Sequence, residues 1–65
     1  MTITLNGDAR ELPDGTTIHQ LLVELKLTPD KVAVEVNRRL VRGDKYEMPL
    51  KDGDGVEVVT FVGGG

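Results

Sequence analysis

The feature that most constrains the fold of this 65-residue chain is a single stretch with helical periodicity. Four apolar residues share one face of it: Ile18, Leu21, Leu22 and Leu25. Thr16 or Thr17 can cap its first turn, and Pro29 cannot continue a helix, so we expect the helix to end within Leu25–Leu27. One helix with one apolar stripe needs one sheet face to cover it.

The segment before the helix predicts a β-hairpin. Residues Thr2–Leu5 alternate polar and apolar side chains, as a half-buried strand does. Asn6-Gly7 follows, and both residues tolerate the positive φ of a tight hairpin turn. We expect Arg10–Leu12 to return as the second strand and Pro13–Gly15 to end the hairpin.

The segment after the helix predicts three further strands. The expected order is a strand over Val32–Val36, a turn over Asn37–Arg39, a short strand over Leu40–Arg42, an irregular segment over Gly43–Leu50, a turn over Asp52–Gly55 and a last strand over Val56–Val62. The compact solution for such an order is an α+β fold in which a mixed sheet packs on one helix. This arrangement is the β-grasp, or ubiquitin-like, roll.

Composition and charge argue against several classes of function. Tyr46 and Phe61 are the only aromatic residues, so we expect an aliphatic core. The formal net charge of −3 argues against nucleic-acid binding, which draws most of its affinity from basic patches. The chain has no cysteine, which excludes disulfides and thiolate catalysis. No apolar run approaches the roughly 18 residues of a membrane span, so we expect a cytoplasmic protein without membrane contact.

The sequence closes on three glycines, Gly63, Gly64 and Gly65. One interpretation is a frayed end or a linker remnant. The other is a flexible arm without side chains, which can enter a narrow channel that any Cβ would block. We therefore divide the chain into a β-grasp domain over residues 1–62 and a flexible glycine tail over residues 63–65.

The element order, the length, Asp52-Gly53-Asp54 before the last strand and the ending Phe61-Val62-Gly63-Gly64-Gly65 together resemble the ThiS family of thiamine-biosynthesis sulfur carriers. The resemblance covers essentially the whole chain. It implies that the Gly65 carboxylate is adenylated by an ATP-dependent, ubiquitin-activating-like enzyme of the ThiF type and converted to a thiocarboxylate. That sulfur then passes to a thiazole synthase of the ThiG type.

The resemblance also implies roles for the partners. Gly63 and Gly64 would thread the partner's active site, and a sulfur donor protein would supply the sulfur. The chain lacks a phosphate-binding loop, so ATP and magnesium would bind the activating partner and this chain would hold no cofactor or metal. It would act as a protein co-substrate and not as an enzyme.

Alternation along the last strand predicts a docking surface. Glu57 should not face the core, so we expect Val56 and Val58 to pack under the helix. Val59 and Phe61 then lie on the open face of the sheet, where exposed apolar side chains suggest a partner surface. The other interpretation is that they pack on a neighbouring strand or on the loop of Tyr46.

Weaker signals have plain interpretations beside functional ones. His19 fits a solvated or capping residue better than a base, since no nucleophile pairs with it. The acidic residues Asp52, Asp54 and Glu57 fit a plain turn better than a calcium loop. The basic residues Arg38, Arg39 and Arg42 fit a solvated hairpin, with contact to an acidic partner as the alternative.

Three further functions remain open at this point. A small subunit of molybdopterin synthase would use the same tail chemistry in another pathway. A ubiquitin-like modifier would be conjugated to lysines. A non-catalytic β-grasp interaction module would use the sheet face alone, and its binding would not need Gly64 and Gly65.

Overall fold

The computed structural model describes residues 1–61. Val62 and the three glycines, with the predictions made for Gly63, Gly64 and Gly65, lie outside the described residues. The elements are β1 (Thr2–Leu5), β2 (Asp8–Glu11), α1 (Ile18–Glu24), the 3₁₀ helix η1 (Pro29–Lys31), β3 (Val32–Val36), β4 (Arg39–Val41), the 3₁₀ helix η2 (Gly43–Lys45) and β5 (Gly55–Thr60).

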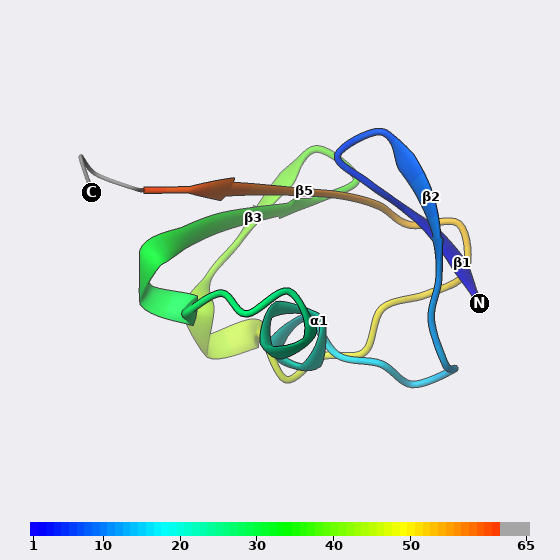
Figure 1. Cartoon of the computed structure of the whole chain (residues 1–65), viewed down its shortest axis with the longest axis horizontal. Helices are drawn as coiled ribbons and strands as arrows, with labels where there is room; N and C mark the ends of the chain where they lie inside the picture. Colours follow the sequence, from blue (N-terminus) through cyan, green and yellow to red (C-terminus); the bar gives the residue numbers. More distant parts are fainter. Residues whose placement is uncertain (62–65) are drawn as a thin grey trace.

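The five strands form one mixed sheet in the order β2-β1-β5-β3-β4. Strand β1 runs parallel to β5, and the other three neighbouring pairs are antiparallel. Helix α1 lies across one face of this sheet, as Figure 1 shows. The predicted α+β fold, a mixed sheet on one helix, is confirmed.

Helix α1 begins and ends with local hydrogen bonds that its sequence encodes. Thr17 is its N-cap, and Thr17 and Gln20 exchange side-chain-to-backbone bonds of 2.9 and 3.0 Å in a capping box. At the other end the Leu27 N–H donates to the Leu22 carbonyl at 2.9 Å, which closes the last turn. The predicted position of the helix is confirmed, and the helix ends at Glu24, one residue before the predicted range, with Leu25 as its C-cap.

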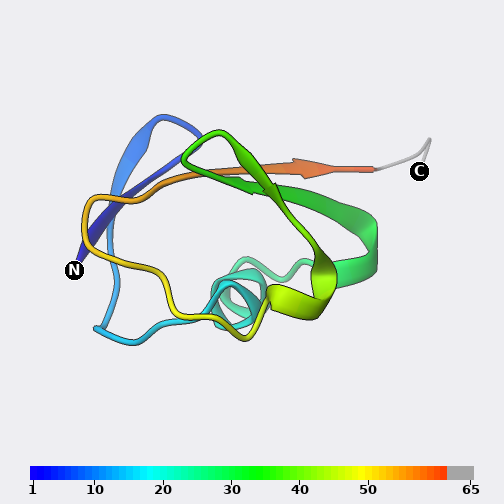
Figure 2. The same cartoon turned by 180° about the vertical axis from the view of Figure 1, so that it is seen from behind.

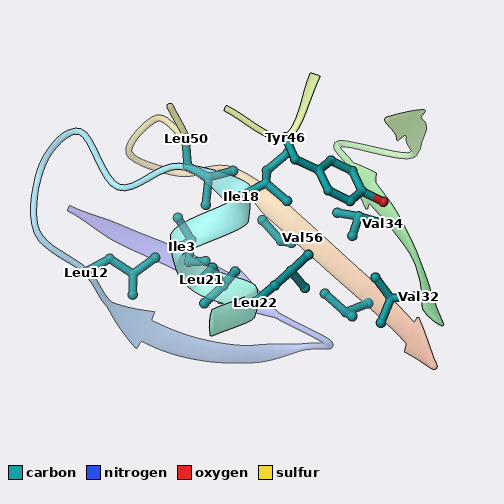
Figure 3. Packing of buried hydrophobic residues seen from close by; sticks show 11 residues of the cluster. Ile3, Leu12, Ile18, Leu21, Leu22, Val32, Val34, Tyr46, Leu50 and Val56 are labelled. Carbon is teal, nitrogen blue, oxygen red and sulfur yellow. The ribbon is translucent and has the colours of Figure 1, made fainter. Parts of the chain in front are cut away.

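The core lies between α1 and the covered face of the sheet. Figure 3 shows its buried side chains, which are Ile3, Leu12, Ile18, Leu21, Leu22, Val32, Val34, Tyr46, Leu50, Val56 and Val58. Ten of these eleven are aliphatic, as the composition predicted. Tyr46 was not predicted to be among them. Its N–H donates to the Gly43 carbonyl at 3.2 Å, and its carbonyl accepts from the His19 N–H at 2.8 Å.

Three strand boundaries differ from the prediction. Strand β2 is Asp8–Glu11 because the two-residue turn places Asp8 directly opposite Leu5. Leu12 follows β2 and is buried in the core. Strand β4 is Arg39–Val41, because the turn between β3 and β4 holds only the two positive-φ residues 37 and 38. The last strand, β5, is Gly55–Thr60.

The segment between β4 and β5 runs beneath the sheet, beside α1. Figure 2 shows it from behind, passing η2 and the start of α1 before it joins β5. A bridge between Thr17 and Pro49 and a 2.8 Å bond from the Leu50 N–H to the Thr16 carbonyl hold it there. Within residues 1–61, no helix is long and apolar enough to cross a membrane.

Candidate functional site

Two apolar side chains near the end of β5 are exposed. Val59 is 60% exposed and Phe61, directly after the strand, is 57% exposed. Val56 and Val58 are buried on the other face, under the helix. The predicted orientation of Val56, Val58 and Val59 is therefore confirmed, whereas Phe61 lines a groove with Leu27 and Val32 from the covered side of the sheet. Of the alternative, packing on the loop of Tyr46 is wrong because Tyr46 is buried in the core on the covered side, whereas packing on a neighbouring strand holds for Phe61, which lines a groove with Val32 of β3.

Strand β3 supports the whole length of β5 on one side. The antiparallel register runs from Val36 opposite Val56 to Val32 opposite Thr60. One more bond continues the ladder, since the Phe61 N–H donates to the Lys31 carbonyl at 2.8 Å. The backbone that carries Val59 and Phe61 is thus fixed from the β3 side.

On the β1 side, β5 has a neighbouring strand only at its first two residues. Strand β1 pairs with β5 only through Thr4 and Leu5, and the chain then turns away at Asn6. Beyond that point the Asn6 side chain replaces the strand's hydrogen bonds. Its Oδ1 accepts from the Val58 N–H at 2.8 Å, and its Nδ2 donates to the Val58 carbonyl at 3.3 Å. The sequence indicated only that Asn6 favours a turn, and no local signal points to this contact.

The turn before β5 is held by carboxylates bonded to backbone and amide groups. Asp54 accepts from the Lys51 N–H at 2.8 Å and from the Asn37 side-chain amide at 3.0 Å. Asp52 accepts from the Thr2 N–H at 2.7 Å. These contacts fit the interpretation as a turn. Among residues 1–61, no group of three or more His, Cys, Asp or Glu side chains is arranged to hold a metal ion.

The remaining candidate residues lie on α1 and around the turn and strand that follow β3. His19 is half-exposed, and its Nδ1 lies 3.1 Å from a Glu47 carboxylate oxygen. Arg38 and Arg39 are exposed at the turn and start of β4, and Arg42 Nε lies 3.6 Å from Asp44. The basic cluster is therefore exposed, as both of its interpretations require.

Comparison with known proteins identifies the family that this chain resembles. The family model described as the ThiS family matches residues 3–65. The sulfur carrier protein ThiS of Bacillus subtilis is 40% identical over 65 residues, covering 97% of this chain and 98% of that protein. The thiazole synthase of Magnetococcus marinus is 46% identical over 66 residues, covering 100% of this chain and 20% of that protein.

A solved structure agrees with these matches. The crystal structure of the thiamine biosynthesis protein ThiS from Geobacter metallireducens has a TM-score of 0.83 and 32% identity to this chain, with 100% of both chains covered. This likeness confirms the β-grasp fold. The chain spans about one fifth of the length of the two thiazole synthases that it matches. On the family match and the near-full-length similarity together, the chain belongs to the ThiS family.

Proposed function

We propose that this chain is a sulfur carrier of thiamine biosynthesis whose working group is the Gly65 carboxylate. The observation that carries the proposal is the family match, which runs through residue 65 and so includes all three glycines. The near-full-length similarity to a protein named as a sulfur carrier supports the same function.

The proposed chemistry activates a poor electrophile. The Gly65 carboxylate oxygen attacks the α-phosphorus of ATP and releases pyrophosphate, which leaves an acyl-adenylate. The terminal sulfur of a persulfide on a donor protein then attacks the acyl carbon, and AMP departs with the bonding electron pair. A second thiol breaks the remaining S–S bond, forms a disulfide with the donor sulfur and releases the carrier. The product is a thiocarboxylate, in which one oxygen has been replaced by sulfur. A ThiF-type enzyme supplies the site for ATP and magnesium, so this chain serves as a co-substrate. The proposed location of the reaction is the cytoplasm.

The folded body supplies binding energy for this reaction. In the proposal residues 1–62 form the docking domain, and residues 63–65 form the arm that enters the partner. Ordering each residue of an arm costs about 1–2 kcal/mol of backbone entropy, which contacts elsewhere must offset. Val59 and Phe61 are the residues proposed to make these contacts, because they are exposed, apolar and adjacent to the arm in sequence.

A thiazole synthase is the proposed acceptor of the sulfur. The support is the Magnetococcus marinus thiazole synthase, which contains a stretch of 66 residues similar to this whole chain. A thiazole synthase that contains a segment similar to this chain supports the proposal that the carrier and the synthase act together.

The test compares the full chain with a chain that lacks Gly64 and Gly65. Each is incubated with a ThiF-type enzyme, ATP and magnesium, and pyrophosphate–ATP exchange is measured alongside circular dichroism. The proposal predicts exchange with the full chain and none with the shortened chain, at equal folding. Equal exchange by both chains would refute the role of Gly65 and favour an interaction module.

A further inference from the structure

A groove with two lysines lies where β5 ends. Lys26 and Lys31 line it together with three apolar side chains, Leu27, Val32 and Phe61. The groove brings together the loop after α1, the 3₁₀ helix η1 and the end of β5, and the views in Figure 1 and Figure 2 both show η1 near that end. We call these five residues the β5-end groove.

The lysines of the β5-end groove are free to meet an external anion. The ion pairs within residues 1–61 involve other side chains, and neither Lys26 nor Lys31 has an acidic partner within 4.0 Å there. Both residues are exposed. Two ammonium groups beside an apolar floor form a local positive site in a chain of net charge −3.

The backbone of Lys26 has a strained conformation. Its φ of +62° is in the left-handed region, at the position after a helix where glycine is favoured. The Lys26 N–H donates to the Val23 carbonyl at 3.0 Å, so the residue is part of the helix ending and cannot relax without loosening that turn. The Lys26 backbone is thereby fixed at the end of the helix, beside the groove that its side chain lines.

We propose that the β5-end groove receives an acidic side chain, flanked by an apolar one, from the adenylating partner. The partner's carboxylate lies between the two ammonium groups, and its apolar neighbour packs on Leu27 and Phe61. A protein surface that presents a carboxylate beside an apolar side chain matches this lining of two ammonium groups and apolar side chains, and Phe61 of the groove is also one of the two proposed docking residues. This inference rests on the proposed function and names the chemistry of its partner.

The experiment measures steady-state adenylation of the full chain by a ThiF-type enzyme. The double variant Lys26→Gln/Lys31→Gln should raise KM for the chain by about threefold to tenfold and leave kcat unchanged, because it removes attraction without touching the reacting group. The difference from the unaltered chain should shrink at high salt. Lys45→Gln, which removes an exposed lysine from η2, is the charge control and should leave KM unchanged.

Glycine variants separate binding from folding. Lys26→Gly should raise the thermal midpoint by several degrees, because it relieves the left-handed strain, and yet raise KM. Arg38→Gly is the matched control: Arg38 has a φ of +70°, so its variant should also gain stability, but with KM unchanged.

The outcomes are distinct. An unchanged KM for the double variant, or an equal rise in KM for Lys45→Gln, would overturn the groove proposal while leaving the sulfur-carrier function intact. No adenylation of the unaltered chain would instead overturn the proposed function, and with it the partner named here.

Discussion

Replacing Asn6 by glycine tests whether one side chain holds the end of β5. The substitution keeps a residue that accepts the φ of +49° at this position. It removes the two bonds, of 2.8 and 3.3 Å, that join the Asn6 amide to the Val58 backbone. Because glycine tolerates the backbone conformation and lacks only the amide side chain, the variant measures the contribution of the two side-chain hydrogen bonds.

The expected loss follows from the bond count. A protein hydrogen bond contributes about 1 kcal/mol to the free energy of unfolding, so two bonds predict a loss of about 2 kcal/mol. In a domain of this size 1 kcal/mol corresponds to about 4–8 °C in Tm, so Tm should fall by about 8–16 °C. Arg38→Gly replaces another positive-φ turn residue, one with no side-chain hydrogen bond among residues 1–61, and should leave stability equal or higher.

Urea unfolding followed by circular dichroism gives the free energy, and amide hydrogen exchange locates the change. The Val58 N–H should exchange faster in Asn6→Gly, since its acceptor is gone, while amides within α1 change only with global stability. Equal stability of Asn6→Gly and the unaltered chain, with Val58 still protected, would refute the claim that Asn6 replaces a strand neighbour of β5.

Three further perturbations probe the core, the proposed docking residues and the buried tyrosine. Leu22→Ala, at a fully buried position of α1, should cost about 2–5 kcal/mol in urea unfolding; a loss under 1 kcal/mol would contradict the packing. Phe61→Asp should change stability by less than about 0.5 kcal/mol yet raise KM for adenylation; the control Val23→Asp, at a site 62% exposed on α1, should leave KM unchanged, and equal effects would argue against a docking face. Burial raises the pKa of the Tyr46 hydroxyl above its ordinary 10.0, so the folded state holds this proton more tightly. The contribution of Tyr46 to stability should therefore be constant at neutral pH and fall as pH rises above about 10; Tyr46→Phe should make the fall smaller, and an equal fall in the variant would contradict the assignment.

Periodicity made the architecture predictable. The apolar stripe of α1 and the alternation of Val32, Val34 and Val36 each indicate which face is buried, and a single covered sheet face satisfies both. The same period of two predicted the exposure of Val59 and Phe61. The strand boundaries were less predictable, because turn geometry sets the register and each of the two hairpin turns holds only two residues.

Contacts between distant parts of the chain could not be predicted. Asn6 and Val58 are 52 positions apart, and no local pattern shows that the turn residue meets the last strand. Tyr46 lies in a stretch without periodicity, so its burial depends on where η2 directs the chain. The β5-end groove has the same origin, because Lys26 and Phe61 become neighbours only when the end of α1 meets the end of β5.

The most direct test of the central claim is intact-protein mass spectrometry. The chain is incubated with a ThiF-type enzyme, ATP, magnesium and a sulfur source, and the product is then fragmented. The account predicts a mass gain equal to replacement of one oxygen by one sulfur, confined to the peptide that ends at Gly65. An unchanged mass after incubation with an enzyme that is active on another carrier would contradict the claim that this chain carries sulfur.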